Sequence, residues 1–201
     1  MRSKEEISKY ALSITGWMGP TEGLTLLKLA TDKDVIEVGS MYGKSTAFMA
    51  PVAKTILCVD TFELSRSLMG PRNPHRLQVR IPEDDDIMPG DVTTLRGFLK
   101  HMEPFDNVTT VVGDSQTVGR VIADNCADLV FVDAGHTYKC VAADIKSWLP
   151  KLRPNGVIAF HDYPLKEGHG HLGVKKAVDE VFKGLIGQVG SVVWTNRTYM
   201  K

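Results

Sequence analysis

The stretch Val35-Ile-Glu-Val-Gly-Ser-Met-Tyr-Gly-Lys-Ser-Thr46 determines the fold predicted for this sequence of 201 residues. An apolar run broken only by Glu37 predicts a buried strand at its start. The chain then turns between Gly39 and Gly43, and residues 44–53 are compatible with a helix. Glycines let the backbone approach a ligand closely, and the first N–H groups of a new helix are free to bind one. The pattern indicates a ligand site at the turn, unless the glycines serve only the geometry of an ordinary turn.

Two nucleotide-binding motifs fit this turn incompletely. A Walker A loop requires G-x-x-x-x-G-K-[ST], but Gly39 and Gly43 enclose only three residues, although Lys44 follows. A dinucleotide fingerprint requires G-x-G-x-x-G, but Met41 stands at its second glycine. The pattern present is E-x-G-x-x-x-G, beginning at Glu37. A P-loop-like kinase or NTPase remains an alternative interpretation, against which the short loop argues.

The composition excludes several classes of partner. The sequence has 24 Lys and Arg against 24 Asp and Glu, a formal net charge of zero. Neither a nucleic acid nor an anionic membrane surface is therefore expected as a partner. No apolar run approaches the roughly 18 residues that span a bilayer, and the polar amino-terminal segment does not resemble a signal peptide. The three cysteines are far apart, so we expect a cytoplasmic protein with reduced thiols.

Strand-like and helix-like segments alternate along the chain. Strands are predicted at residues 35–38, 55–60, 108–114, 128–133 and 156–160, with a closing pair at 188–193 and 194–200. Helices are predicted at residues 4–13, 22–30, 44–53, 115–124, 138–152 and 173–183. Thr21 and Ser115 are the expected helix caps, and Trp17 and Met18 are expected in the core. The alternation favours an α/β fold, a mostly parallel sheet with helices on both faces.

The sequence predicts a single domain over residues 1–201 with two additions. Residues 1–20 are a helical extension, and residues 61–90 are an insert rich in Pro, Arg and Asp. An insert this long without predicted structure is a lid, an arm for a partner or a disordered segment. Because it follows Asp60 at the predicted ligand edge, we expect a lid.

Each of the five predicted parallel strands ends in an acid. The carboxyl ends of all strands in an open parallel sheet lie along one edge, where ligands bind. Five acids along one edge repel each other and are costly to desolvate. They predict a cation or a ligand rich in hydrogen-bond donors, and separate roles as helix caps are the alternative. The five residues are Glu37, Asp60, Asp114, Asp133 and Asp162.

The order of these motifs resembles that of the class I S-adenosylmethionine (SAM) methyltransferases, over about residues 21–182 without the insert. Three stretches are similar to the small bacterial natural-product O-methyltransferases of the macrocin and cephalosporin type, and more distantly to catechol O-methyltransferase. They are Val132-Asp-Ala-Gly-His-Thr-Tyr138, Phe160-His-Asp-Tyr163 and Gly173-Val-Lys-Lys-Ala-Val-Asp-Glu180. The resemblance implies a Rossmann-like, doubly wound sheet of seven strands, mostly parallel, with an antiparallel last strand.

The resemblance also implies a role for each matching residue. SAM would be bound through its methionine part by Glu37, Gly39, Ser40, Met41, Gly43 and Ser45, through its ribose by Asp60 and Thr61, and through its adenine by Gly113, Asp114 and Ser115. Asp133 would stand between SAM and a divalent cation, with His161 and Asp162 as further metal ligands. His136 matches the position of a general base, so His136 and Asp133 are the implied catalytic residues.

His161 departs from the family pattern, because the relatives often carry an acid at its position. Imidazole suits Mg²⁺ poorly but binds Mn²⁺, Fe²⁺ or Zn²⁺. Either the metal is softer than Mg²⁺, or His161 is a base or lies next to the metal ligands without binding the metal, or no metal binds. A hydrogen-bonded structural histidine is the remaining alternative.

The sequence thus predicts a SAM-dependent methyltransferase that methylates the hydroxyl of a small molecule with the help of a divalent cation, Mg²⁺ or Mn²⁺. A metal-independent methyltransferase and a non-catalytic SAM- or nucleotide-binding module remain alternatives. The expected partner is a small-molecule acceptor, with neither nucleic acid nor membrane. Residues 1–20 and the insert are candidate contacts of a homo-oligomer.

Overall fold

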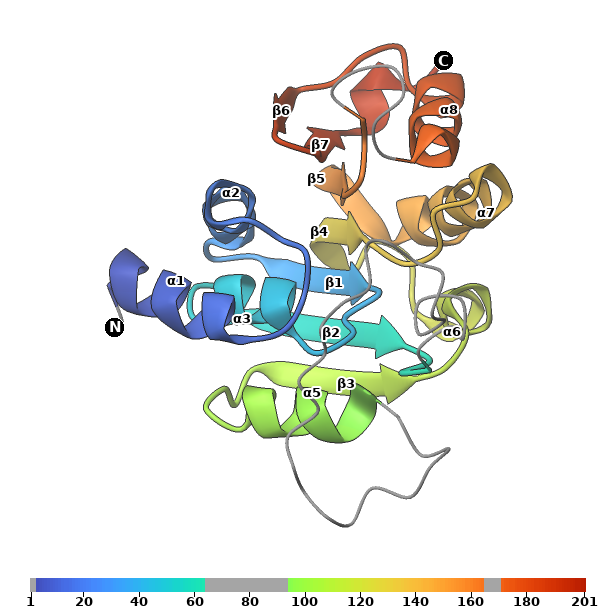
Figure 1. Ribbon diagram of the computed structural model, residues 1–201. Coiled ribbons are helices and arrows are strands. Elements are labelled where there is room, and N and C mark those ends of the chain that lie inside the picture. The colour runs from blue at the N-terminus through green and yellow to red at the C-terminus, as the bar shows by residue number, and fades with distance from the viewer. Residues whose placement is uncertain (1–2, 64–93, 165–170) are drawn as a thin grey trace, which may run out of the picture.

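The computed structural model describes residues 3–63, 94–164 and 171–201 (Figure 1). The predicted lid therefore lies outside the described residues, except for residues 61–63. None of the described helices is long and apolar enough to cross a membrane.

A seven-stranded sheet forms the centre of the molecule, with the strand order β3-β2-β1-β4-β5-β7-β6. Strands β1 to β5 are mutually parallel, β7 is antiparallel to β5, and β6 is antiparallel to β7. The strands are β1 Asp34–Val38, β2 Thr55–Asp60, β3 Val108–Val112, β4 Ala127–Val132, β5 Leu152–Phe160, β6 Gly187–Val189 and β7 Val192–Thr195. The predicted fold class is confirmed, including the antiparallel last strand.

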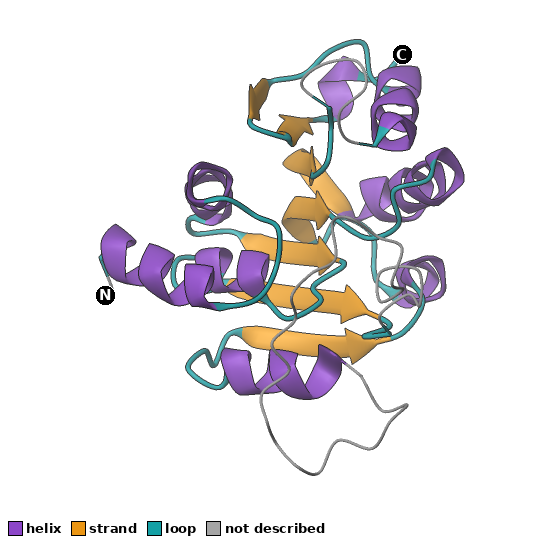
Figure 2. Cartoon of the chain, viewed as in Figure 1, coloured by secondary structure: helices purple, strands orange, loops and turns teal. Residues whose placement is uncertain are grey.

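Helices cover both faces of this sheet, as Figures 1 and 2 show. One face carries α1 Lys4–Ser13, α2 Pro20–Ala30, α3 Lys44–Met49 and α5 Thr94–Met102, and the other carries α6 Ser115–Val121, α7 Tyr138–Trp148 and α8 Leu172–Val181. Two short 3₁₀ helices follow α7 and β7, at Leu149–Lys151 and Arg197–Tyr199. Each face has its own apolar core, one around Phe48 and Phe98 and the other around Trp148 and Phe160.

Alternation along the central strands divides the two cores. On β1, Val35 joins the core around Phe48, whereas Ile36 and Val38 join the core around Trp148. Successive side chains of a strand point to opposite faces, so Glu37 must point into the first core. A carboxylate in that position requires hydrogen-bond donors of its own.

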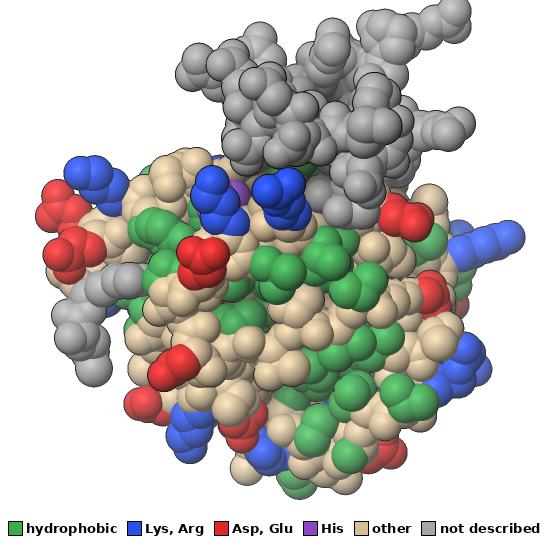
Figure 3. Space-filling view, turned by 90° about the horizontal axis from the view of Figure 1, so that it is seen from below, with side chains coloured by type: hydrophobic (Ala, Val, Ile, Leu, Met, Phe, Trp, Pro, Cys, Tyr) green, Lys and Arg blue, Asp and Glu red, His purple; other side chains and the backbone are tan. Residues whose placement is uncertain are grey.

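The charged surface agrees with a net charge of zero. The view from below in Figure 3 shows Lys and Arg interspersed with Asp and Glu among apolar side chains, with no large field of one sign. Some apolar side chains are exposed, such as Leu99 on α5 and Val112 on β3.

Several local expectations were wrong. Trp17 is 53% exposed, although Met18 is buried as expected. Helix α2 begins at Pro20 after Gly19 as its N-cap, so Thr21 lies inside the first turn. The N-cap of α6 is Asp114, one residue before the predicted cap.

Helix α5 was missed altogether, although its apolar residues have a helical spacing. Leu95, Phe98, Leu99 and Met102 follow one another at intervals of three, one and three residues, the pattern of an amphipathic helix. Phe98 and Met102 are buried in the first core, so the helix completes the cover of the sheet beside β3.

Gly39, directly after β1, packs against the backbone of the residue that follows β4. It has φ +92°, a conformation that other residues rarely adopt, and its amide donates to the carbonyl of Val59 at 2.9 Å. A Cβ at this position would lie 2.2 Å from the carbonyl oxygen of Asp133. The close approach of two backbones therefore explains this glycine without a ligand.

We predict that Gly39→Ala destabilises the protein by about 3 kcal/mol or more, since it combines an unfavourable φ with a clash against backbone. Gly184→Ala is the matched control, because its Cβ would lie 3.6 Å from Tyr199, an ordinary contact. The control should change the free energy of unfolding by no more than about 0.5 kcal/mol. Urea unfolding measures both, and equal stabilities of the two variants would contradict this account of Gly39.

Candidate functional site

The turn after β1 is closed by its own backbone. The amide of Gly43 donates to the carbonyl of Ser40 at 2.7 Å, and Gly43 has φ +88° as the N-cap of α3. Met41 has φ +46° although it is not glycine. A non-glycine residue in this region is uncommon and is held there by its surroundings.

Glu37 supports the turn from beneath. Its side chain is fully buried, and it accepts hydrogen bonds from the hydroxyls of Ser40 at 2.8 Å, Ser45 and Thr46. The thiol of Cys58 also donates to it, at 3.4 Å. Burial raises the pKa of Glu37, against the opposing effect of these hydroxyls. The structure thus shows Glu37 bracing the turn, and contact with the ammonium group of a ligand stays a prediction.

Asp60 ties the turn to the end of β2. Its Oδ2 accepts from the amide of Met41 at 2.8 Å, and its Oδ1 accepts from the amide of Phe62 at 2.7 Å. Thr61 beside it is exposed. The amide of Gly113 donates to the carbonyl of Asp60 at 2.9 Å, which brings the end of β3 to the same place. The predicted contacts for the ribose therefore do lie beside the glycine turn.

Asp114 has the structural role that was the alternative for the strand-end acids. Its Oδ1 accepts from the amide of Thr117 at 3.0 Å, as an N-cap does. This capping bond does not test whether an adenine binds here, and that contact stays a prediction for Gly113, Asp114 and Ser115.

A partly buried network that sequence reasoning missed holds the start of α6. The hydroxyl of Ser115 donates to Asp144 on α7, and the indole of Trp148 donates to Ser115 Oγ at 2.9 Å. The amide of Gln116 also donates to Asp144, at 3.0 Å. Burial raises the pKa of Asp144. Only the Asp144–Trp148 spacing of four residues on one helix hinted at a shared partner.

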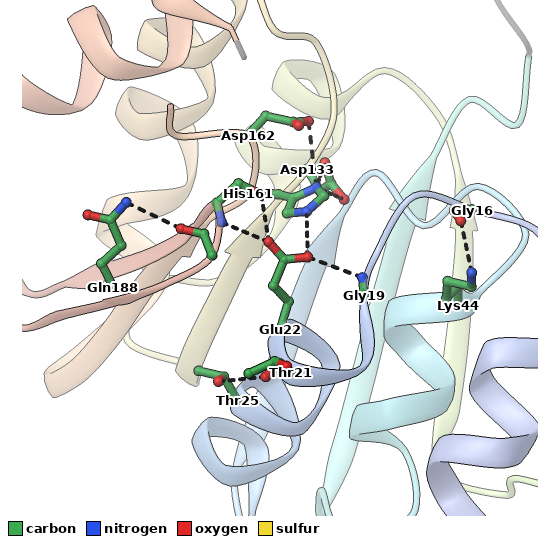
Figure 4. A network of polar contacts seen from close by, with 12 residues as sticks. Gly16, Gly19, Thr21, Glu22, Thr25, Lys44, Asp133, His161, Asp162 and Gln188 are labelled. Atoms are coloured by element: carbon green, nitrogen blue, oxygen red, sulfur yellow. Dashed lines mark hydrogen bonds and ion pairs between the residues drawn. The ribbon is translucent and has the colours of Figure 1, made fainter. Parts of the chain in front are cut away.

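Lys44 does not reach into the glycine turn. Its Nζ donates to the carbonyl of Gly16 at 2.8 Å, as Figure 4 shows. The lysine that a P-loop would use for phosphate instead secures the segment between α1 and α2. This arrangement argues against the kinase or NTPase interpretation.

Two histidines and two aspartates form a cluster at the ends of β4 and β5. The Nδ1 atom of His161 lies 3.2 Å from Asp133 Oδ1 and 3.5 Å from Asp162 Oδ2. The Nε2 atom of His136 lies 2.9 Å from Asp162 Oδ2 and 3.8 Å from Asp133 Oδ1. The structure therefore brings together all four residues that the sequence assigned to catalysis and metal binding.

The backbone at Asp162 is unusual. It has φ +58° directly after β5, a conformation more accessible to Asp than to most residues but still uncommon. Residues held in this region are enriched at functional sites. The conformation places the carboxylate of Asp162 between the two imidazoles.

Glu22 is a member of this cluster that sequence reasoning missed. Its Oε2 lies 3.8 Å from the Nε2 of His161, on the side of the ring opposite Asp133 (Figure 4). Glu22 belongs to α2, far from β4 and β5 in the sequence, and the sequence showed only an ordinary acid in the first turn of a helix.

The charges of the cluster shift each other's pKa values strongly. Burial lowers the pKa of His161, but the carboxylates of Asp133, Glu22 and Asp162 outweigh it and raise that pKa to about 11. Burial also lowers the pKa of His136, but Asp133 and Asp162 raise it to about 9. Burial raises the pKa of Asp133, but the two neighbouring imidazoles, His161 above all, hold it below its usual value. Both imidazoles are therefore protonated at neutral pH unless another cation takes the place of their protons.

Two sets of three side chains at this edge have ligand atoms close enough to share a cation. One set is Asp133, His161 and Asp162, and the other is His136, Asp162 and His171, with ligand atoms within 4.8 Å of one another in each set. The rings of His136 and His171 are stacked, with centroids 4.2 Å apart and planes 20° apart. In-plane lone pairs of stacked rings run side by side and do not converge on one ion. The set with Asp133 and His161 therefore fits a cation better.

The donors of that set suit a borderline divalent metal. They combine two carboxylates with one imidazole nitrogen, a mixture suited to Mn²⁺, Fe²⁺ or Zn²⁺ more than to Mg²⁺. The Nε2 of His136, which is buried and makes no hydrogen bond of acceptable geometry, lies beside this set. The residues present thus fit a cation.

A family model described as “Methyltransferase domain” matches residues 36–163 of the chain. The chain belongs to this methyltransferase family. The matched segment of the methyltransferase includes the glycine turn, Asp60 and the four clustered residues at the ends of β4 and β5. Glu22 and His171 lie outside it.

Solved structures with the same fold cover nearly the whole methyltransferase chain. A protein of Corynebacterium glutamicum has a TM-score of 0.61 and 12% identity, over 98% of this chain and 91% of its own. A putative O-methyltransferase from Klebsiella pneumoniae has a TM-score of 0.60 and 14% identity, over 96% and 89%. The SAH-bound methyltransferase PaMTH1 of Podospora anserina has a TM-score of 0.60 and 15% identity, over 96% and 86%. At these identities the similarity shows the fold.

A curated relative matches only a short part of the methyltransferase. It is the uncharacterized protein y4gI of Sinorhizobium fredii, 47% identical over 49 residues. The match covers 24% of this chain and 5% of that protein.

We predict that Glu37→Ala destabilises the methyltransferase by about 2–5 kcal/mol, because it leaves a cavity and three hydroxyls without their acceptor. Glu37→Gln is the matched control and should lose much less at pH 7, because it keeps an acceptor and the fold disfavours a buried charge. Chemical unfolding of both variants measures the difference. Equal losses would contradict the bracing role.

The stabilities of the wild type and Glu37→Gln should also differ in their dependence on pH. The folded pKa of Glu37 lies above its ordinary value of 4.5, so its carboxyl stabilises the fold most below pH 4.5, and this contribution is lost as the pH rises through the folded pKa. The wild type should therefore gain stability relative to Glu37→Gln as the pH falls from 7 to 4. If the wild type instead loses stability relative to Glu37→Gln as the pH falls over this range, the pKa of Glu37 is not raised by burial.

Proposed function

We propose that the protein binds SAM across the glycine turn and transfers its methyl group to the hydroxyl oxygen of a small molecule, with a divalent cation at the acceptor. The family match supports methyl transfer, and PaMTH1, which shares the fold, was solved with SAH bound. The neighbour from Klebsiella pneumoniae is described as a putative O-methyltransferase, which supports oxygen as the acceptor atom.

One observation carries the proposal: the glycine turn and the cluster of titratable side chains are in contact. Gly39 begins the turn, and it packs so closely on the backbone of Asp133 that no Cβ fits between them. Asp133 in turn contacts His136 and His161. A cofactor lying on the turn would therefore present its methyl group beside the residues that can bind and deprotonate an acceptor. Alignment of two bound reactants supplies a large part of the acceleration.

The proposed SAM contacts follow the predicted positions. The turn of Gly39, Ser40, Met41 and Gly43 would receive the methionine part, over the brace formed by Glu37 and Ser45. Asp60 and Thr61 would bind the ribose, since each carboxylate oxygen of Asp60 accepts one backbone amide and keeps a lone pair for a hydroxyl. Gly113, Asp114 and Ser115 would border the adenine.

The cation would be held by Asp133, Asp162 and the Nδ1 of His161, with Mn²⁺ better suited than Mg²⁺. Such a cation would supply one effect, a lower pKa for an acceptor hydroxyl bound at the site. Asp133 would then lie beside the glycine turn that binds the cofactor and would also be a ligand of the cation that binds the acceptor.

His136 is the proposed general base. It lies at the mouth of the cluster, 38% exposed, with Asp162 at 2.9 Å. With its pKa raised to about 9 it holds a proton at pH 7, so it accepts one only when the charge of the neighbouring carboxylates is offset. A cation held by Asp133 and Asp162 would offset their charge and return the pKa of His136 toward its ordinary range.

A metal-independent methyltransferase is the second candidate, and one observation favours it. His161 lies between Asp133 on one side and Glu22 on the other. A proton on each ring nitrogen would give each of these carboxylates a charged hydrogen-bond donor, without a metal. His161 would then orient Asp133, and His136 would act alone on the acceptor.

We predict that SAM binds to the purified protein and that ATP does not. Asp60→Asn should weaken SAM binding by roughly 10-fold or more, since one charge-assisted hydrogen bond contributes about 1.5–3 kcal/mol. Asp106→Asn is the matched control, because Asp106 is exposed and precedes β3 at the opposite end of that strand. Isothermal titration calorimetry measures all three proteins. Heat from ATP with none from SAM would sink the proposal.

We also predict that methyl transfer depends on Asp162 and on a cation. The assay follows SAH release with a library of phenols, catechols and sugars as acceptors. Asp162→Ala should reduce turnover of any acceptor found by about 100-fold or more, and EDTA should do the same to the wild type until Mn²⁺ is restored. Asp106→Asn again serves as the control. Undiminished turnover in EDTA would decide for the metal-independent candidate.

A further inference from the structure

Glu22 and Asp133 approach His161 from opposite sides. The Nε2 of His161 lies 3.8 Å from Glu22 Oε2, and its Nδ1 lies 3.2 Å from Asp133 and 3.5 Å from Asp162. His161 is 6% exposed and Glu22 is 16% exposed. Each ring nitrogen therefore has a distinct neighbour, and water has little access to either.

The position of Glu22 is fixed by segments far apart in the sequence. Its Oε2 accepts from the amide of Gly19 at 3.1 Å, which completes the capping of α2. Its Oε1 accepts from the amide of Ser191 at 2.7 Å and from the hydroxyl of Ser191 at 2.9 Å. A Cβ on Gly190 would lie 2.4 Å from Oε1. The carboxylate is thus held between α2 and the turn that joins β6 to β7.

Carboxylates face both ring nitrogens of His161, and Asp133 at Nδ1 is closer than Glu22 at Nε2. Glu22 therefore decides the tautomer only where a cation takes the place of the proton on Nδ1. Neutral histidine carries one N–H and one lone pair. In that case the N–H of His161 is on Nε2 and faces Glu22. With the proton on Nε2, the lone pair is on Nδ1 and faces the carboxylates of Asp133 and Asp162. A lone pair and two carboxylates repel each other unless a cation lies between them. This is the arrangement in which an outer carboxylate orients a metal-bound histidine.

We propose that Glu22 is a positioning residue of the cation site: it keeps the proton of His161 on Nε2 and so presents Nδ1, together with Asp133 and Asp162, to a divalent cation. The inference rests on the cation of the proposed function. It adds a residue outside the segment that the family model matches, and it assigns the coordinating atom of His161. It also makes the β6–β7 turn part of the support of the site.

The first test compares the affinity for Mn²⁺ of three full-length proteins by calorimetry. Glu22→Gln should bind Mn²⁺ about 10–100-fold more weakly than the wild type, the usual effect of losing an outer carboxylate. Ser191→Ala is the matched control, because it removes one hydroxyl from Oε1 and leaves Oε2 facing His161. Its affinity should stay within about threefold of the wild type. An affinity of Glu22→Gln equal to that of the wild type overturns the proposal, and so does a wild type that binds no Mn²⁺.

The second test needs no variant and so does not depend on the folding of Glu22→Gln. Nitrogen-15 NMR of histidine-labelled wild type, with Zn²⁺ as a diamagnetic probe, distinguishes the two ring nitrogens of His161. The proposal predicts that Nε2 stays protonated while the Nδ1 resonance shifts on addition of Zn²⁺. A metal-induced shift at Nε2, or a proton retained on Nδ1 at saturating Zn²⁺, contradicts it.

Calorimetry with SAM on the same samples separates this inference from the proposed function. SAM should bind wild type and Glu22→Gln with similar affinity, because the polar contacts of Glu22 are with Gly19, Ser191 and His161. A wild type that binds SAM but no Mn²⁺ overturns the role of Glu22 and leaves methyl transfer standing. A wild type that binds Mn²⁺ through Glu22 but no SAM overturns the proposed function instead.

Discussion

The contact between Gly39 and the backbone of Asp133 is the constraint on which the site depends. It joins the exits of β1 and β4, so the turn that would carry a cofactor cannot move independently of the residue at the centre of the charged cluster. The buried Glu37 and its three hydroxyl donors fix the same turn from below. The proposed function therefore depends on close backbone packing in the middle of a parallel sheet.

Charge balance governs the other half of the site. Glu22, Asp133 and Asp162 bring three carboxylates to two imidazoles, of which His161 is buried. Such a group is stable only when protons or a cation offset the negative charge. The proposed cation would take the place of protons in this cluster, and the position of His161 between two carboxylates would determine which of its nitrogens binds it.

Regular, local patterns made much of the fold predictable from the sequence. The apolar runs of β1, β2 and β4 and their strand-end acids gave the parallel sheet and brought Asp60, Asp133 and Asp162 to one edge. Glu37 was assigned to that edge, and the alternation of side chains along β1 points it into the first core, where it supports the glycine turn. Helix α5 was missed although its apolar spacing was present in the sequence.

Contacts between distant segments were not predictable in the same way. In the sequence, Glu22 is only an acid in the first turn of a predicted helix. The fold brings it to His161 and Ser191. Lys44 matched part of a phosphate-binding motif, but its bond to Gly16 depends on where the amino-terminal segment passes. The most direct measurement of the central claim is a crystal structure with SAH and Mn²⁺, using the anomalous signal of the metal. The account predicts the adenosyl group against Gly39 and Asp60, with a metal peak between Asp133, Asp162 and the Nδ1 of His161. An adenosyl group bound elsewhere would contradict it.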